Sequence, residues 1–466
     1  MDFFTFDLVL LFESLPSASN PFGVMLLLFT SGGWVVFIFV FIWGAWIARV
    51  EFIRNRYSDN LEYVLLAIDV PKMNEQSPKA VEHIFAHLYG IRKSGNLKDK
   101  YLKGYTQPSI SLEIVSLEGF IQFLIRAPIK FRDLVEAAIY AQYPEAEITE
   151  VDDYIDLIPK PLEFPHPEWD LWGTQYKMTK NQAYPIKTYP FFEHSLSQKL
   201  MDPMASLMET MSRLGPGEHI WIQIIISPEK DKWKEEGVRL INKLIGKKSE
   251  KSSIDWMYFP REVGRGLGES FTASIVPPTE MESANKKKVE REWPSQMQHL
   301  SPLERGVVES IGIKIEKLGF MTKVRFIYAA KKKVMNTGRG AYAVNGAFAQ
   351  FSSQTGNSFS INKKVQTKIN YFFTKRRLLA RKRRLLWAYR DRGMKRGRKG
   401  SIFNIEELAT IWHFPVSEVG IASVQSVDAK KAQPPAALPV ETSLLSPRKS
   451  EATNSKNAPP INLPTS

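Results

Sequence analysis

Residues 109–126, SISLEIVSLEGFIQFLIR, decide the fold of this chain. In the first part, apolar and polar side chains alternate, which is typical of a strand with one buried face. The apolar positions are Ile110, Leu112 and Ile114. Gly119 indicates a turn, and Phe120–Arg126 reads as a second strand. The stretch therefore predicts two sequential strands of a sheet.

The sequence on either side of these strands supplies two helices and two more strands. A Ser-Pro pair at 77–78 fits a helix start, because Ser caps the first turn and Pro suits its first position. The predicted elements are a strand at 61–70, a helix after 77–78, a helix over 131–139 and a strand at 146–151. The order β-α-β-β-α-β predicts a ferredoxin-like domain over residues 58–160. That fold supports many functions and does not identify one.

A second, larger α+β domain is predicted over residues 161–420. Residues 217–226 predict a strong buried strand, 321–330 a further strand, and 173–179 could form another. Helices are expected at 202–214, 230–245, 303–318 and 340–351. We interpret this set as a diverged repeat of the first domain. Residues 247–297 form an irregular insertion, and the Pro-rich residues 421–466 predict a disordered tail. The expected fold class is α+β.

An apolar stretch near the N-terminus predicts one transmembrane helix. Residues 24–48, VMLLLFTSGGWVVFIFVFIWGAWIA, carry no charge, and about 20 apolar residues suffice to span a bilayer. We place the helix and its juxtamembrane part at 23–56. Arginines follow the span and acids precede it, so residues 1–22 are expected outside and the rest in the cytoplasm, at the plasma membrane. A buried core helix is the alternative.

Charge is concentrated in one segment. The whole chain has a net charge of +14, whereas residues 363–399 hold sixteen Lys and Arg and one acid. This segment therefore carries +15 and the remaining chain −1. The chain has no cysteine, which excludes disulfides, thiol catalysis and cysteine-ligated zinc.

Residues 368–392 within this segment predict a basic helix with a narrow apolar seam. Apolar pairs recur every seven residues, at 371–372, 378–379 and 385–386. The candidate lipid- or nucleic-acid-binding residues are Lys375, Arg376, Arg377, Arg381, Lys382, Arg383, Arg384, Arg390, Lys395 and Arg396. The helix could contact anionic lipid, neutralise nucleic-acid phosphates, or be a solvated helix docked through its seam. Heptad spacing also permits pairing with another helix.

Signatures of catalysis are weak throughout. His83 and His87 stand four apart on a predicted helix, but they face away from its apolar side and are expected to be solvated. The glycine clusters 264–268 and 338–340 fit turns or helix caps better than nucleotide binding, and no P-loop pattern occurs. We therefore predict a non-enzyme with no cofactor and no metal.

Several stretches carry a resemblance to a known family. They are 70–88 (VPKMNEQSPKAVEHIFAHL), 133–154 (DLVEAAIYAQYPEAEITEVDDY), 184–190 (YPIKTYP), 202–210 (DPMASLMET) and 402–415 (IFNIEELATIWHFP). The chain resembles the N-terminal, membrane-tethered, non-motor region of predicted conjugation and type IV secretion ATPases of the FtsK/HerA class. In that family a motor domain follows, whereas this sequence reaches a Pro-rich tail.

The resemblance implies a membrane-anchored, non-catalytic accessory or scaffold component of a DNA- or protein-translocation apparatus. Its expected partners are membrane lipid, a separately encoded P-loop ATPase and further copies of itself. The alternative hypothesis is a membrane-tethered nucleic-acid-binding protein that acts through the basic helix.

Overall fold

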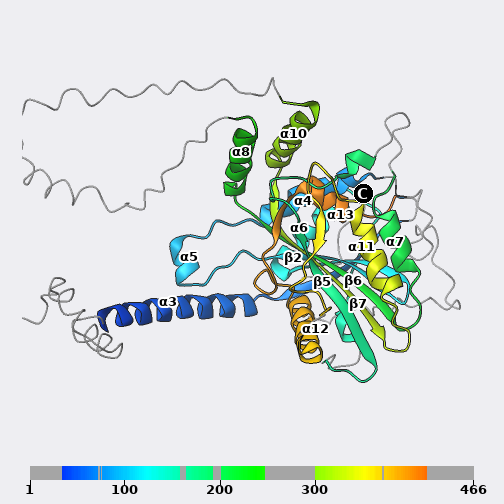
Figure 1. Ribbon diagram of the computed structural model, residues 1–466, viewed down its shortest axis with the longest axis horizontal. Coiled ribbons are helices and arrows are strands. Elements are labelled where there is room, and N and C mark those ends of the chain that lie inside the picture. The colour runs from blue at the N-terminus through cyan, green and yellow to red at the C-terminus, as the bar shows by residue number, and fades with distance from the viewer. Residues whose placement is uncertain are drawn as a thin grey trace, which may run out of the picture.

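The computed structural model describes residues 34–71, 74, 76–157, 164–192, 201–246, 300–369 and 372–416. Three regions discussed above lie outside these residues: the N-terminal segment 1–22, the insertion 247–297 with its glycine cluster 264–268, and the tail 421–466. The described part is a mixed α+β structure built on one large antiparallel sheet (Figure 1).

The sheet has nine strands within the described residues, in the order β4-β1-β3-β2-β6-β7-β5-β8, with β9 paired to β7 beside this path. Every pairing is antiparallel. The strands are β1 (Tyr63–Asp69), β2 (Ile110–Leu117), β3 (Phe120–Pro128), β4 (Glu147–Glu150), β5 (Trp169–Met178), β6 (Glu218–Pro228), β7 (Gly319–Lys331), β8 (Phe359–Ile361) and β9 (Ser401–Asn404).

The first half of the sheet has the order β4-β1-β3-β2. Strand β3 lies between β1 and β2, and β1 lies between β3 and β4, so each β-α-β unit is split by one antiparallel strand. The crossover helices are α4 (Pro78–Leu88) and α6 (Arg132–Tyr140). Short elements join them: η3 (Tyr89–Ile91), α5 (Leu97–Tyr101), η4 (Ile129–Phe131) and η5 (Tyr154–Leu157).

The second half repeats this order with its own strands, β8-β5-β7-β6. After β5 come η6 (Tyr189–Phe192) and α7 (Ala205–Ser212); after β6 come α8 (Lys232–Leu244) and α10 (Pro302–Glu316). After β7 come a π-helical turn, η8 (Gly338–Tyr342), and α11 (Ala343–Ala349). The glycine pair 338–340 thus sits in a helical turn, where a Cβ on Gly340 would lie 2.6 Å from the Tyr328 ring.

The two halves are joined edge to edge by β2 and β6. Their register runs from Ile110 opposite Ile226 to Leu117 opposite His219. One apolar cluster contains buried side chains from both halves, including Leu112 and Ile222. The boundary expected near residue 160 therefore divides two halves of one sheet that share a core.

One face of the sheet is covered by helices. Helices α4, α6, α7 and α11, together with α13 (Ile405–Ile411), contribute buried side chains to the large apolar cluster (Figure 1). The start of α13 is fixed by a capping box, in which Asn404 and Glu407 each accept from the other's backbone N–H. Glu407 also pairs with the buried Lys314 at 2.9 Å. This C-terminal β9–α13 unit was not anticipated as structure.

The N-terminal helix α3 (Trp34–Asp59) extends away from the sheet (Figure 1). In the described residues, no helix is both long and apolar enough to cross a membrane. The described uncharged part is Trp34–Ala48, and Arg49 and Glu51 follow it within the same helix. Residues 24–33 of the expected span lie outside the description, so the crossing helix is not supported.

Candidate nucleic-acid interface

The basic helix α12 (Thr374–Asp391) lies against the other face of the sheet (Figure 1). Its C-terminal half docks through Leu385, Leu386 and Tyr389, which join a second apolar cluster with Trp221 and Ile327. Leu379, from the middle pair of the predicted seam, is half-buried against the same cluster, whereas Phe372, which precedes the helix, is 85% exposed. The seam thus docks from Leu379 to the C-terminal end of the helix.

A buried ionic cluster fixes that end. Arg392, directly after α12, donates to both carboxylate oxygens of Glu113 on β2, at 2.7 and 3.1 Å. It also donates to Asp153 at 2.5 and 3.0 Å. The Tyr154 hydroxyl donates to Glu113 at 2.9 Å and lies 2.6 Å from the Tyr389 hydroxyl.

The charges in this cluster stabilise one another. Burial alone would raise the pKa of Glu113, but the Arg392 guanidinium outweighs it and holds that pKa below its ordinary value. Burial likewise opposes the charge of Arg392, and its two carboxylates raise the pKa of the guanidinium. The end of α12 is therefore attached to the sheet by a paired, hydrogen-bonded ion cluster.

A second buried cation holds the loop that follows α12. Arg325 on β7 donates to the carbonyls of Ala388 at 2.5 Å and Arg396 at 2.7 Å. Burial lowers the pKa of Arg325 to about 10. Its Nε atom is buried and has no hydrogen-bond partner among the described residues. Lys323 also donates to the Arg396 carbonyl, at 2.9 Å.

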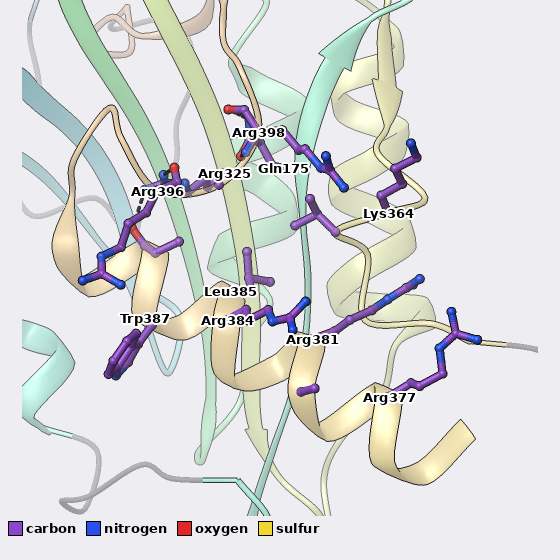
Figure 2. A pocket seen from close by; sticks show the side chains of 14 residues that line it. Gln175, Arg325, Lys364, Arg377, Arg381, Arg384, Leu385, Trp387, Arg396 and Arg398 are labelled. Carbon is purple, nitrogen blue, oxygen red and sulfur yellow. Dashed lines mark hydrogen bonds between the residues drawn. The ribbon is translucent and has the colours of Figure 1, made fainter. Parts of the chain in front are cut away.

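These constraints leave a cleft of about 800 Å³ between α12, the loop after it and the sheet (Figure 2). Seven of its lining residues are basic, and none of the described residues that line it is acidic. The basic residues are Arg325, Lys364, Arg377, Arg381, Arg384, Arg396 and Arg398. Figure 2 shows that these side chains come from separate segments of the chain. The cleft is therefore suited to an anion with several negative charges.

Hydrogen bonds order the walls of the cleft. The Gln175 side chain donates to the Arg398 carbonyl at 2.9 Å and accepts from the Arg398 N–H at 3.1 Å. Arg381 donates to three carbonyls of the segment after β8, between 2.9 and 3.1 Å. Trp387 is 66% exposed at the rim, with the Arg396 guanidinium 4.8 Å from its ring centre.

A smaller hollow of about 580 Å³ continues the basic surface. It shares Lys364 and Arg398 with the cleft and adds Lys177 on β5 and Lys363. The described residues that line this hollow also include no acid. The two hollows together make a basic path from α12 to the β5–β8 edge of the sheet.

The structure separates the ten predicted residues into two groups. Four line the cleft: Arg377, Arg381, Arg384 and Arg396. The other six lie elsewhere: Lys375, Arg376, Lys382, Arg383, Arg390 and Lys395. Among these, Lys382 is buried and paired with Asp170, so it is not available to a ligand. Arg383 donates to the Phe164 carbonyl, and Lys395 donates to Asn55 at 2.8 Å.

Residues outside the predicted helix complete the cleft. Arg325, Lys364 and Arg398 were not among the candidates, nor was Trp387. The sequence held one signal for Arg325, because Lys323 and Arg325 occupy alternate positions in a mostly apolar strand. In a buried strand such charges need partners, so they mark a polar face.

Metal binding receives no support from the described residues, since no group of three or more His, Asp and Glu there could hold an ion. His83 and His87 are both exposed on α4.

Fold and cleft together define a class: a mixed α+β protein in which a basic helix and a continuous antiparallel sheet enclose a cationic cleft. A family model described as a domain of unknown function (DUF8128) matches residues 66–425, and the chain belongs to this family. The match begins within β1 and extends past α13, so it covers both halves of the sheet and α12. No curated protein matches the chain.

Proposed function

We propose that this chain is a membrane-attached, non-catalytic nucleic-acid-binding protein whose basic cleft holds a phosphate backbone. The observation that carries the proposal is the cleft itself, with seven cations and no acid among its described lining residues. Lys and Arg side chains that contact phosphates supply most of the affinity of non-specific nucleic-acid binding.

The shape of the site favours nucleic acid over lipid as its ligand. A bilayer surface is broad, and a helix that binds it presents its cations on one outward face. Here Arg377, Arg384 and Arg398 line a recess between α12 and the sheet, which suits a linear polyanion. The exposed Trp387 at the rim offers a base a stacking surface, as in proteins that bind single strands.

Membrane attachment is the second part of the proposal. On α3, the side chains of Phe39, Phe41 and Ile42 are 69%, 77% and 61% exposed, so the core of the protein does not cover them. An uncharged helical stretch that is exposed all round is costly in water. We propose that residues 24–48 anchor the chain in the plasma membrane as a single pass, with the N-terminus outside.

The sequence resemblance described above supports a proposal about the assembly in which this protein acts. We propose an accessory or scaffold role in a type IV secretion-like DNA- or protein-translocation apparatus, beside a separately encoded P-loop ATPase and other copies of the chain. A pull-down of the detergent-solubilised full chain, followed by mass spectrometry, tests this role. Recovery without any ATPase of that class would count against it.

The binding test compares two triple variants of the full chain in detergent. The first removes cleft charges (Arg377→Gln, Arg384→Gln, Arg398→Gln), and the control removes three charges of α12 that do not line the cleft (Lys375→Gln, Arg376→Gln, Arg383→Gln). Binding of a fluorescein-labelled oligothymidine is measured by anisotropy across a salt series. We expect the cleft variant to bind at least about tenfold more weakly and to lower the salt slope by about 2.

The control variant should stay within about twofold of the wild type, since it loses the same net charge outside the cleft. Equal losses in the two variants would mean that binding follows total charge and not the cleft. Absence of oligonucleotide binding by the wild-type chain would reject the proposed function.

A further inference from the structure

A loop that projects beside α3 carries features of a membrane surface contact. Residues 93–105 contain α5 and lead away from the sheet on the same side of the molecule as α3 (Figure 1). Leu97 is 72% exposed and Leu102 is 59% exposed at its far end. Large apolar side chains at the tip of a projecting loop contribute nothing to the core of the protein.

Three contacts hold this loop along α3. The Tyr105 ring meets the Tyr57 ring edge-on, with 5.6 Å between centres. Gly104 has φ +70° and lies so close that a Cβ would be 2.5 Å from the Ile53 carbonyl oxygen. The Tyr101 ring stacks on Trp46 with 6.5 Å between centres. Because α3 rises 1.5 Å per residue, the contacts follow α3 for about 16 Å.

The far end of the loop therefore lies beside the point where the uncharged stretch of α3 ends and its charged residues begin. Trp46 is in the last turn of the uncharged stretch, and Arg49, the first charged residue after it, lies 5.8 Å from the Trp46 ring. Trp at the end of an apolar helix, followed by Arg, is typical of the membrane–water interface. Tyr101, stacked on Trp46, falls at the same depth.

The charge of the loop complements an anionic lipid surface. Residues 93–105 contain four lysines and one acid, Asp99, which gives a net charge of +3. Asp99 pairs with Lys103 at 3.2 Å, while Lys98 is exposed beside Leu97. Basic side chains around exposed apolar ones are the composition of segments that bind at the headgroup level.

We propose that residues 93–105 form a second membrane contact, which inserts Leu97 and Leu102 at the headgroup level and places its lysines against anionic phospholipids. This contact rests on the proposed anchoring through α3. Because the loop packs along α3 and α3 leads to β1, the contact fixes the orientation of the sheet and its basic cleft relative to the membrane.

The chain contains no cysteine, so single cysteines introduced into the full chain can be labelled without background. Leu97→Cys and Leu102→Cys report on the loop, and Phe41→Cys reports on the anchor. Leu303→Cys on α10 is the control, because it is also apolar and 66% exposed. Each variant carries the fluorophore NBD and is reconstituted into phosphatidylcholine–phosphatidylglycerol vesicles that contain lipids spin-labelled near the headgroup or deep in the chains.

We expect headgroup-level spin labels to quench the probes at 97 and 102 at least about twofold more than the probe at 303. Deep labels should quench the probe at 41. Adding Lys98→Gln and Lys100→Gln should weaken the quenching at 97 and leave that at 41 unchanged. Loop probes quenched no more than the control, with the probe at 41 quenched, would overturn the loop contact and keep the anchor. An unquenched probe at 41 would overturn the anchor and the loop contact with it.

Discussion

The two faces of the sheet are stabilised in different ways, and neighbouring residues of β2 show the contrast. Leu112 and Glu113 are both fully buried and point to opposite faces. Leu112 packs in the large apolar cluster under the helices, whereas Glu113 binds Arg392 and holds the end of α12. Apolar packing is tolerant of the identity of its side chains, while a buried ion pair requires both partners. Apolar packing on the helix-covered face thus stabilises the sheet, whereas the ion pair on the opposite face positions α12, which borders the basic cleft.

The largest expected effect follows from breaking the ion pair. Glu113→Gln leaves Arg392 buried with Asp153 as its remaining acid, so we expect the free energy of unfolding to fall by about 3–5 kcal/mol. Urea unfolding of the full chain in detergent, followed by tryptophan fluorescence, measures the loss. The double variant with Arg392→Met should lose much less stability than the sum of the two single changes, because it removes the buried charge that Glu113 no longer balances. A loss below about 1 kcal/mol for Glu113→Gln would show that the pair does not hold α12.

A second polar residue on the same face predicts a pH dependence. Burial raises the pKa of Asp69 from its ordinary value of 3.8 to about 6, although Gln122 donates to it at 2.7 Å. Between about pH 4 and pH 6 the Asp69 carboxyl group is mostly deprotonated in the unfolded chain but still protonated in the folded chain. The free energy of unfolding therefore falls as pH rises through this range. Above pH 6 the cost is constant, at most about 3 kcal/mol.

Asp69→Asn removes this titration and should therefore be more stable than the wild type at pH 7 but not at pH 3.5. The measurement is the difference in melting temperature between the two proteins at several pH values, which cancels the contributions of other carboxyl groups. A difference that does not change with pH would contradict the raised pKa.

Even on the helix-covered face, the sequence predicted some elements and missed others. Strands such as β2 and β3 and helices such as α4 were predicted, because their apolar side chains follow the period of the element. The β9–α13 unit was missed as structure. Strand β9 has four residues and α13 has seven, which is too short for a clear period.

The cleft could be predicted only in part, for a physical reason. The charge density of α12 was evident, and four of the ten candidates line the cleft. Which cations remain available depends on partners distant in sequence: Asp170 binds Lys382, and β7 contributes Arg325. The alternation of apolar and polar residues over 109–115 also placed Glu113 on the polar side of the strand. Only the tertiary structure shows that α12 and Arg392 bury that side.

A smaller effect is expected where the loop after α12 approaches the sheet. Gly397 has φ +88°, and a Cβ there would lie 2.6 Å from the Gln175 side-chain oxygen. Gly397→Ala should therefore cost about 1–2 kcal/mol and displace the cleft wall, which lowers oligonucleotide affinity several-fold. Gly346→Ala on α11 is the matched control, since no atom lies within 4 Å of its Cβ and Ala favours a helix. Equal affinities for the two variants would argue against Gly397 shaping the site.

The smallest effect should come from an isosteric change on the apolar face, one residue from the ion pair. Leu112→Met retains nearly the same volume, and neither side chain carries a polar group that needs a partner, so we expect a loss below about 1.5 kcal/mol. The same urea titration provides the measurement, and oligonucleotide binding should stay at the wild-type level because α12 lies on the opposite face. A loss as large as that of Glu113→Gln would mean that the apolar face also depends on the exact shape of its side chains. In that case burial, and not the ion pair, would explain the sensitivity of β2.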